Sequence, residues 1–272
     1  MFQEEMIKDI DQFNKGFELF LSKKILNQNN QLSKSIHYSI FSGGKRFRPY
    51  LIFILSKELN LSKNNIMHLS CAVEMLHNYS LVHDDLPAMD NDKFRRGKKT
   101  THYKYNEYTA ILAGCALLTQ AFNILSNKSF KTSEQIKSSL INELTKITGE
   151  EGLLMGQYQD LSLKKFDMKK RLLINKLKTG MLMAYSSYSV AIISNKEKKY
   201  QKKMKELGMM IGEIFQINDD FQDFPNMKSS DKKMYELYKE DLYQKSHTIM
   251  DELNFKKQKT FQLLDFVFDL KV

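Results

Sequence analysis

The sequence predicts an all-α protein. Apolar residues recur at the three- and four-residue spacing of amphipathic helices along most of the chain, and no stretch keeps the alternation of a strand. Residues that break helices are rare, since the 272 residues include 3 prolines and 11 glycines. A chain of this length can bury a sizeable core. Because neither an internal repeat nor a linker interrupts it, we expect a single domain over residues 1–272.

The periodic segments give the helices in order, joined by short connections. We expect helices over residues 2–26, 31–41, 46–59, 63–86, 107–126, 132–146, 149–163, 167–194, 197–223, 231–254 and 256–270. The first carries an apolar stripe from Phe13 to Leu21 that should pack on the rest of the domain. Pro49 is tolerated in the first turn of its helix, where the backbone N–H has no helical partner, and Pro87 ends a later helix.

Several features predict a cytoplasmic protein without stable membrane insertion. The first residues, MFQEEMIKDIDQF, form an acidic amphipathic segment, which is typical neither of a secretory signal nor of an Arg-rich transit peptide. No run of eighteen apolar residues occurs, so we expect no spanning helix. Cys71 and Cys115 lie in apolar runs, and we expect buried thiols in a reducing compartment instead of a disulfide.

A net charge of +10 is typical of proteins that bind nucleic acid. Here the lysines are scattered among Asp, Glu and Asn instead of forming a basic face. We therefore interpret the charge as a solvated surface and expect no nucleic-acid partner. A helical scaffold for nucleic acid is the alternative, and it would bind with a steep salt dependence.

A basic turn, GGKRFRP, precedes the third predicted helix at Gly43 to Pro49. The N-terminus of a helix carries partial positive charge and unpaired N–H groups, which favour an anion. Lys45, Arg46 and Arg48 add charge at the same place. The turn is therefore a candidate phosphate site, with an ordinary basic turn as the alternative.

The stretch HNYSLVHDDLPAMDNDKFRRG, from His77 to Gly97, concentrates the chemistry of the sequence. Three close carboxylates repel one another unless a cation lies between them, and oxygen ligands of this kind suit Mg²⁺, which completes its shell with water and phosphate oxygens. Two adjacent guanidiniums can bind the same phosphates through paired N–H groups. The charged residues concerned are Asp84, Asp85, Asp90, Arg95 and Arg96. The stretch therefore predicts a metal-bridged diphosphate site.

The spacing within this stretch constrains its geometry. His77 lies seven residues before Asp84, on the same face of the predicted helix, so it could contribute to phosphate binding. Asp90 follows a proline, so it cannot share a regular helical face with Asp84, and a bend must bring it back. A calcium loop starting at Asp90 would need Gly and Glu where the chain has Arg95 and Thr101, so we exclude one.

The middle of the chain carries fewer functional signals. The helices over 107–146 contain mostly Ala, Leu, Ile and Ser on their inner faces, which indicates close helix packing. In GQYQDL, Gln157 and Asp160 share a helical face, which fits either a hydrogen-bonding wall near a substrate or a polar surface. In KLKTG, Thr and Gly are poor helix formers, so we expect a local kink at Lys178–Gly180.

A second acidic cluster lies in FQINDDFQDF, at residues 215–224. Asp219 and Asp223 are four residues apart and share a helical face with Gln216. Like charges at this spacing destabilise a helix, and a bound cation is the simplest compensation. We expect this cluster, with Asp220 beside it, to oppose the first acidic cluster.

In combination, these motifs resemble those of the short-chain trans-isoprenyl diphosphate synthases of the polyprenyl synthetase family, and most of all bacterial-type farnesyl diphosphate synthases. The resemblance runs from about residue 35 to about residue 224, through GGKRFRP, YSLVHDDLPAMDNDKFRRG, GQYQDL, KTG and FQINDD in this order. It implies a bundle of about ten or more helices around a central cavity, usually in a homodimer.

The resemblance also implies a reaction and its residues. An allylic diphosphate would condense with isopentenyl diphosphate through a carbocation, with Mg²⁺, three ions in all, bound to the allylic substrate. The metal ligands implied are Asp84, Asp85, Asp90, Asp219 and Asp223. The isopentenyl diphosphate pocket implied is Lys45, Arg48, His77 and Arg96. The allylic site, including the region that faces the cation, is implied to be Arg95, Lys178, Thr179, Gln216 and Lys233. The residues expected to act in catalysis are Asp84, Asp90, Arg95, Lys178, Thr179, Gln216 and Asp219.

The chain departs from the family after residue 224. The family continues with a Gly-Lys pair, a Gly-x-Asp segment and a Lys-Ser/Thr turn, whereas this chain has PNMKSSDKKMYELYKEDLYQKSHTIM. Lys233 falls at the expected lysine, and Lys245–Ser246 resembles the later turn, but the glycines are missing. A weakly active or non-catalytic subunit of a heteromeric synthase is therefore one alternative. A terpene cyclase is another, although it needs no second diphosphate pocket.

The resemblance places the residues that limit product length at Tyr79 and Ser80, whereas ideal helix geometry puts Ser80 directly under Asp84. Burying the five carbons of one more isoprene unit is worth about 4 kcal/mol, at about 0.8 kcal/mol per methylene, so only bulk can stop the extension. We predict farnesyl diphosphate as the product, with geranyl and geranylgeranyl diphosphate as alternatives.

Overall fold

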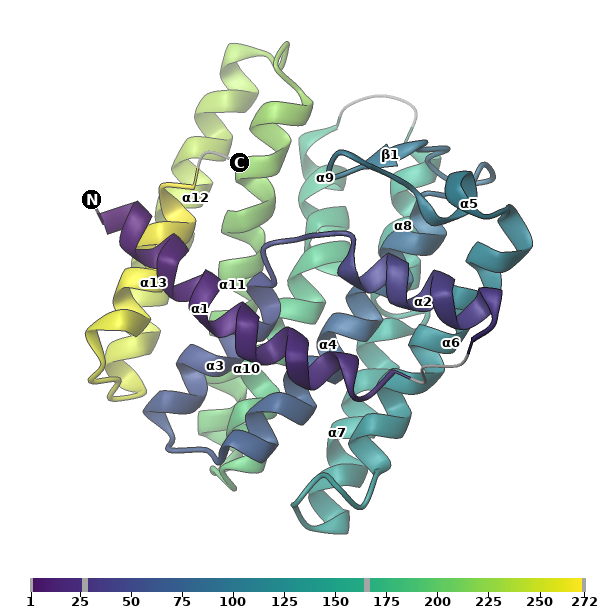
Figure 1. Ribbon diagram of the computed structural model, residues 1–272. Helices are drawn as coiled ribbons and strands as arrows, with labels where there is room; N and C mark the ends of the chain where they lie inside the picture. The colour runs from purple at the N-terminus through teal and green to yellow at the C-terminus, as the bar shows by residue number, and fades with distance from the viewer. Residues whose placement is uncertain (1, 26–28, 164–166, 271–272) are drawn as a thin grey trace. The chain divides into compact units, whose positions relative to one another are not determined.

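The computed structural model describes residues 2–25, 29–163 and 167–270, and it confirms the all-α prediction (Figure 1). The helices are α1 (Phe2–Ser22), α2 (Gln31–Phe41), α3 (Phe47–Glu58), α4 (Lys63–Asp84), α5 (Thr101–Lys104), α6 (Glu107–Ser126), α7 (Glu134–Thr148), α8 (Leu153–Ser162), α9 (Met168–Asn175), α10 (Met181–Ile193), α11 (Lys198–Asp223), α12 (Ser229–Glu252) and α13 (Gln258–Phe268). The expected end of the first helix at residue 26 lies outside the described residues.

Helix starts follow from local capping chemistry. Asn30, Ser62, Asn106 and Asp167 each precede a helix, and each side chain accepts a hydrogen bond from the backbone N–H of the third helical residue. These caps satisfy N–H groups that have no partner within the helix, which fixes where each helix begins.

The chain divides into two compact units. Unit 1 comprises Met1–Met6, Leu51–Leu61 and Ser138–Val272, and unit 2 comprises Ile7–Tyr50 and Ser62–Lys137. The first acidic cluster belongs to unit 2 and the second belongs to unit 1. The single domain expected from the sequence stays a prediction.

In unit 2, α4 packs along α6, and the contact depends on small residues. Gly114 faces the His83 imidazole so closely that a Cβ would collide with it, and Ala113 and Leu117 are buried nearby. This confirms the close packing predicted for this segment. Cys71 of α4 is a buried free thiol as expected, but Cys115 of α6 is exposed, so the prediction of burial was wrong for it.

Helix α6 also carries an exposed apolar face. Tyr108, Ile111 and Leu112 are 66%, 44% and 51% exposed. Among the described helices, α6 is the one that is long and apolar enough to cross a membrane, which is weak evidence because length and composition alone select it and 44% of its apolar window is buried.

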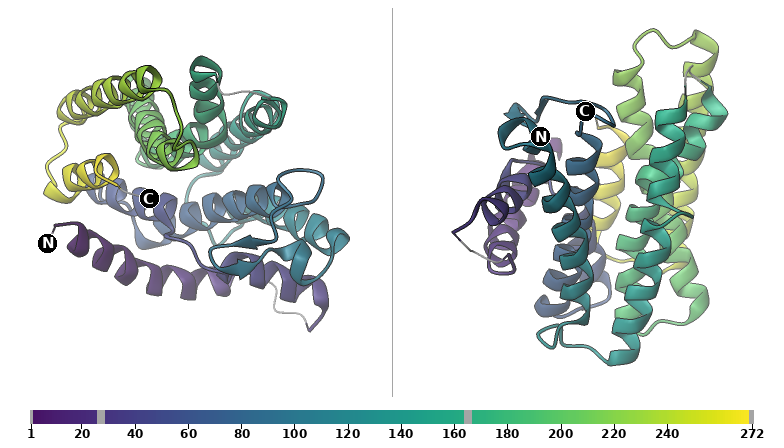
Figure 2. Two further views of the ribbon diagram at one scale, coloured as in Figure 1. Left: turned by 90° about the horizontal axis from the view of Figure 1, so that it is seen from above. Right: turned by 90° about the vertical axis from the view of Figure 1, so that its right-hand side faces the viewer.

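Unit 2 contains a hairpin and a short helix that the sequence did not predict. Strands β1 (Phe94–Arg95) and β2 (Lys98–Lys99) pair antiparallel and lead into α5 (Figures 1 and 2). Arg96 and Gly97 form the turn in the left-handed region, at φ +55° and +74°. Strands of two residues are too short to show alternation, which is why the pattern missed them.

Unit 1 holds the second acidic cluster on α11, which packs along α10. Gly208 and Gly212 bring the two helices together, since a Cβ at Gly212 would lie 2.8 Å from the Gly180 Cα atom. The kink predicted at Lys178–Gly180 is confirmed as a π-helical turn, η1 (Lys176–Gly180), which splits the expected 167–194 helix into α9 and α10.

The segment after residue 224 differs from the expectation. Lys245 and Ser246 lie inside α12, where the Ser246 hydroxyl donates to the Leu242 carbonyl at 2.8 Å, so they form no turn. The run from Ser229 to Glu252 contains neither Gly nor Pro, so nothing interrupts the helix there.

Candidate active site

The first acidic cluster forms where α4 ends. Asp84 is the last residue of the helix and is buried, whereas Asp90 is exposed. The backbone N–H of Asp90 donates to the Asp84 carbonyl at 2.8 Å. This hydrogen bond confirms the predicted bend, because it returns the chain to the end of α4 after Pro87.

Asp85 is held by an arginine of the following hairpin. Arg95 donates from Nε to Asp85 Oδ1 at 2.6 Å and contacts Asp92 at 3.3 Å. Burial raises the pKa of Asp85, and the Arg95 guanidinium lowers it in part. Asp85, the second aspartate of this motif, is therefore bound by Arg95, and this contact occupies part of the Arg95 guanidinium.

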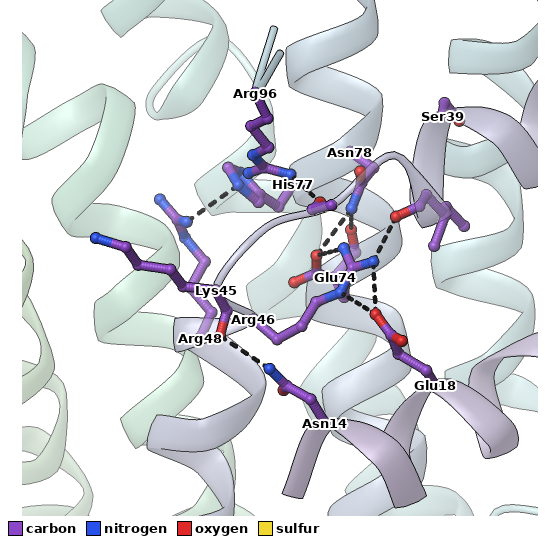
Figure 3. A network of polar contacts seen from close by, with 12 residues as sticks. Asn14, Glu18, Ser39, Lys45, Arg46, Arg48, Glu74, His77, Asn78 and Arg96 are labelled. Carbon is purple, nitrogen blue, oxygen red and sulfur yellow. Dashed lines mark hydrogen bonds and ion pairs between the residues drawn. The ribbon is translucent and has the colours of Figure 1, made fainter. Parts of the chain in front are cut away.

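The residues predicted to bind isopentenyl diphosphate gather around the turn before α3 (Figure 3). Arg48 Nη1 lies 3.3 Å from His77 Nε2, and Arg96 Nη1 donates to the Gly43 carbonyl at 2.5 Å. The Arg96 guanidinium lies directly over Gly44, where any side chain would collide with it. Gly43 and Gly44 have φ of +106° and +127°, so glycine is required there for the backbone as well.

The cluster of Lys45, Arg48, His77 and Arg96 is electropositive. The pKa of His77 is lowered well below its ordinary value of 6.5 by burial and by the guanidiniums of Arg48 and Arg96, so its imidazole is neutral near pH 7. Lys45 is exposed at the turn. Concentrated positive charge beside a neutral hydrogen-bonding ring suits a phosphate ligand.

Arg46, the middle basic residue of the turn, has a different place. It is 3% exposed and pairs with Glu74 at 2.6 Å and Glu18 at 3.1 Å (Figure 3). Burial lowers the pKa of its guanidinium, but the two carboxylates raise this pKa by more, so the net change is an increase. Counting its charge with Lys45 and Arg48 was therefore wrong, because Arg46 anchors the turn from beneath.

The residues predicted to limit product length lie on α4. Tyr79 is 8% exposed and meets His83 edge to face at 4.9 Å between ring centroids. The Ser80 hydroxyl donates back to the His77 carbonyl at 2.9 Å. Tyr79 is therefore a fixed bulky group, and Ser80 is a small one.

In unit 1, three of the predicted allylic residues, Lys178, Thr179 and Gln216, make side-chain hydrogen bonds. Lys178 Nζ donates to Asp160 Oδ2 at 2.9 Å, and the Thr179 hydroxyl donates to Gln216 Oε1 at 2.7 Å. Asp160 of GQYQDL therefore takes part in hydrogen bonds inside the unit, whereas a wall near a substrate stays a prediction. Gln157 is buried on the same helix.

Asp220, at the centre of the second acidic cluster, is fully buried. Its carboxylate accepts hydrogen bonds from Arg171 Nε at 3.2 Å, Asn175 Nδ2 at 2.5 Å and the Tyr235 hydroxyl at 3.3 Å. Burial raises the pKa of Asp220, and Arg171 opposes that shift. No motif singles out these three donors, although Arg171 and Asn175 are four residues apart and so share a helical face.

The remaining predicted residues of this unit are more open. Asp219 is partly exposed, and Asp223 is exposed one turn further along α11. Lys233 is exposed near the start of α12. The helical face predicted for Asp219 and Asp223 thus reaches solvent, while Asp220 points into the unit.

The metal predicted from these carboxylates is a hard cation. Among residues 2–25, 29–163 and 167–270, no three His, Cys, Asp or Glu side chains gather closely enough to form a complete metal site. Mg²⁺ does not require such a site, because it takes one or two carboxylates and fills its shell with water and phosphate oxygens. The carboxylate donors of both clusters fit Mg²⁺ and do not fit a zinc site of nitrogen and sulfur ligands.

Comparisons with known proteins define the class. The sequence matches the polyprenyl synthetase family over residues 29–265. It is 38% identical to the farnesyl diphosphate synthase of Micrococcus luteus over 228 residues, covering 80% of this chain and 76% of that protein. It is 32% identical to the chloroplastic geranylgeranyl pyrophosphate synthase of Capsicum annuum over 261 residues, covering 90% and 70%.

A solved structure gives the fold. The FPP/GFPP synthase of Zymomonas mobilis superposes with a TM-score of 0.85 at 27% identity, covering 98% of this chain and 97% of that one. The protein is thus an all-α isoprenoid synthase in fold. It belongs to the polyprenyl synthetase family.

Proposed function

We propose that this protein is a Mg²⁺-dependent prenyltransferase that condenses dimethylallyl or geranyl diphosphate with isopentenyl diphosphate to give farnesyl diphosphate. Membership of the polyprenyl synthetase family supports the reaction class. The observation that carries the proposal is the basic cluster of Lys45, Arg48, His77 and Arg96 in the same unit as the first acidic cluster. A cyclase would need no second diphosphate pocket, whereas a condensing enzyme does.

Isopentenyl diphosphate would bind at that basic cluster. Arg48 and Arg96 present forked N–H donors that match phosphate oxygens, and Lys45 adds a mobile point charge. His77, neutral near pH 7, can donate one ring hydrogen bond. The buried Arg46 pairs keep the turn in place while these groups bind.

The allylic diphosphate would be held through Mg²⁺ bound to the carboxylates that the family resemblance implies. Asp84, Asp90, Asp219 and Asp223 would hold Mg²⁺, with Asp85 and Asp220 assisting through their arginine partners. When bound, the ions neutralise the diphosphate and make it a better leaving group. This placement rests on the carboxylate donor sets described above and on the family.

The residues of this chain would then stabilise charge as it develops. Lys178, with Arg95 and Lys233, would bind negative charge on the departing diphosphate as the allylic C–O bond breaks. The oxygens of Thr179 and Gln216 would face the positive allylic carbon. The double bond of isopentenyl diphosphate attacks that carbon, a C–C bond forms, and a proton passes from isopentenyl C2 to the departed diphosphate. Side chains around the cation must exclude water, which would quench it.

Tyr79 would set the product length by closing the space below Asp84. Its burial and its contact with His83 support this role. Geranylgeranyl diphosphate is the second candidate product. The match to the geranylgeranyl pyrophosphate synthase of Capsicum annuum covers 90% of this chain.

We further propose a cytoplasmic homodimer formed from one domain over residues 1–272. The exposed apolar face of α6, with Tyr108, Ile111 and Leu112, is a surface that a second copy would cover. Free thiols at Cys71 and Cys115 fit a reducing compartment.

The experiment that tests the function is incubation of the purified chain with dimethylallyl diphosphate and labelled isopentenyl diphosphate, with and without Mg²⁺. We expect labelled farnesol after dephosphorylation only when Mg²⁺ is present. Absence of any labelled prenyl product with Mg²⁺ would refute the proposal and favour the non-catalytic subunit.

A further inference from the structure

Arg171 is the least expected residue of the site, because no motif contains it. It comes from α9, its side chain is 12% exposed, and its guanidinium joins two carboxylates from different helices. Nη1 donates to Asp160 Oδ1 of α8 at 2.5 Å, and Nε donates to Asp220 Oδ1 of α11 at 3.2 Å. The Phe224 ring covers the guanidinium at 5.1 Å from its centroid.

These contacts belong to a ring of side chains. From Arg171 the ring passes through Asp160 to Lys178, whose ammonium donates to Asp160 Oδ2 at 2.9 Å. In the other direction it passes through Asp220 to Gln216, whose Nε2 lies 3.5 Å from Asp220 Oδ1. Thr179 closes the ring, because it donates to Gln216 at 2.7 Å and is the sequence neighbour of Lys178.

Arg171 is the member that fixes the other residues of the ring. A lysine could not replace it, because a single ammonium lacks the planar fork that reaches two carboxylates at set angles. Without the guanidinium, the donors described for Asp220 would all be neutral, since they are Gln216, Asn175 and Tyr235 around a buried charge. The Asp160 carboxylate would then pair with Lys178 alone, so the charge of the Lys178 ammonium would be neutralised more strongly.

We infer that Arg171 is a positioning residue for the allylic diphosphate site. Arg171 links Asp160 to Asp220 and thereby positions Lys178, Thr179 and Gln216. It also balances the formal charge of the ring, which then contains two cations and two carboxylates. This inference rests on the proposed function. The isopentenyl diphosphate cluster lies in unit 2 and has no part in the ring.

The test is steady-state kinetics of Arg171→Met with the concentration of each substrate varied separately. The net charge of the ring becomes −1, which repels a diphosphate, and Asp160 pairs with Lys178 alone and competes with the diphosphate for its ammonium. We expect the KM for the allylic diphosphate to rise about tenfold while the KM for isopentenyl diphosphate changes by less than about twofold. Arg171→Lys, which keeps the charge and loses the fork, should give a smaller shift in the same direction.

Lys170→Met is the matched control, since it removes one charge from an exposed position of the same helix. It should change neither KM. Equal changes in both KM values for Arg171→Met and Arg171→Lys, or a fall in melting temperature with unchanged kinetics, would show that Arg171 serves the fold alone and would overturn the inference.

Binding of geranyl thiolodiphosphate with Mg²⁺, measured by calorimetry, separates this inference from the proposed function. It needs no turnover, so a wild-type chain that makes no product can still report on Arg171. Affinity that falls in Arg171→Met and holds in Lys170→Met supports the inference. Equal affinity in wild type and Arg171→Met refutes it.

Discussion

The two acidic clusters share a pattern and differ in how firmly they are held. In each, the second residue of the Asp-Asp pair is buried and bound by an arginine, Asp85 by Arg95 and Asp220 by Arg171. Asp85 has a partly exposed partner from the hairpin that follows it in sequence. Asp220 is fully buried and accepts from three elements, α9, α11 and α12.

The shared pattern indicates that the aspartates within each motif have different roles, and the difference shows that the two second aspartates are held to different extents. The second aspartate of each pair is bound by protein groups, and the flanking aspartates are the ones that we propose as Mg²⁺ ligands. The cluster in unit 1 is held by groups from several helices, whereas the cluster in unit 2 lies at the end of α4 and is bound by Arg95 of a short hairpin. The flanking and second positions should therefore respond differently to substitution, and so should the two second positions.

The largest effect is expected from the first aspartate of each pair. Asp84→Asn and Asp219→Asn each remove a carboxylate proposed to hold Mg²⁺, so we expect kcat to fall by about 10³-fold or more. Product formation from labelled isopentenyl diphosphate at saturating substrate and Mg²⁺ measures this. Activity within tenfold of wild type in either variant would contradict the assignment of the flanking aspartates.

Substitution of the second aspartate of each pair is expected to lower the stability of the fold, and to lower it more in unit 1 than in unit 2. Asp220→Asn leaves the guanidinium of Arg171 partly unpaired in a buried place, which should cost about 3 kcal/mol of the free energy of unfolding. Asp85→Asn should cost about 1 kcal/mol, because Arg95 is partly exposed and keeps Asp92. Urea unfolding of both variants measures the difference, and equal losses would mean that the two clusters are held equally firmly.

Product length tests whether Tyr79 of α4 limits the extension of the chain. Tyr79→Ala removes a buried ring, so we expect a longer product, since each further isoprene unit gains about 4 kcal/mol of burial. Chromatography of the dephosphorylated alcohols reports the chain length. Ser80, the other residue predicted to limit length, loses only a hydroxyl in Ser80→Ala, so that variant should keep the product length. A product of unchanged length from Tyr79→Ala would remove Tyr79 from this role.

The pH dependence of stability gives the smallest effect. The folded pKa of His77 lies well below 6.5, so between these values the unfolded state binds more protons than the folded state. Stability should therefore rise with pH up to about 6.5 and be lost as the pH falls towards the folded pKa. His77→Gln should flatten this part of the curve in urea unfolding at several pH values, and an unchanged slope would show that His77 is not its source.

Sequence reasoning succeeded where the physical cause is local. Helical periodicity placed α2 and α6 within their observed bounds, and a proline required the bend that returns Asp90 to Asp84. The weak helix formers of KLKTG indicated the kink that appears as η1. Each of these features depends on residues that are close together in the chain.

It failed where the cause is distant in sequence. Arg46 looks like its neighbours in a basic motif, and only Glu18 and Glu74, from two other helices, reveal that it is buried. Arg171 carries no motif, because its partners come from α8 and α11. Pairings of this kind follow from tertiary packing, which a one-dimensional pattern does not encode.

The most direct test of the account asks whether Asp84 and Asp219 hold the same ligand. Calorimetry would measure the Mg²⁺-dependent affinity for inorganic diphosphate in wild type, Asp84→Asn, Asp219→Asn and the double variant. If both carboxylates bind one metal–diphosphate complex, the double variant should bind only slightly less tightly than the weaker single variant. The interaction free energy between the two substitutions should then exceed about 1 kcal/mol. Losses that add to within about 0.5 kcal/mol would show two independent sites and contradict the account.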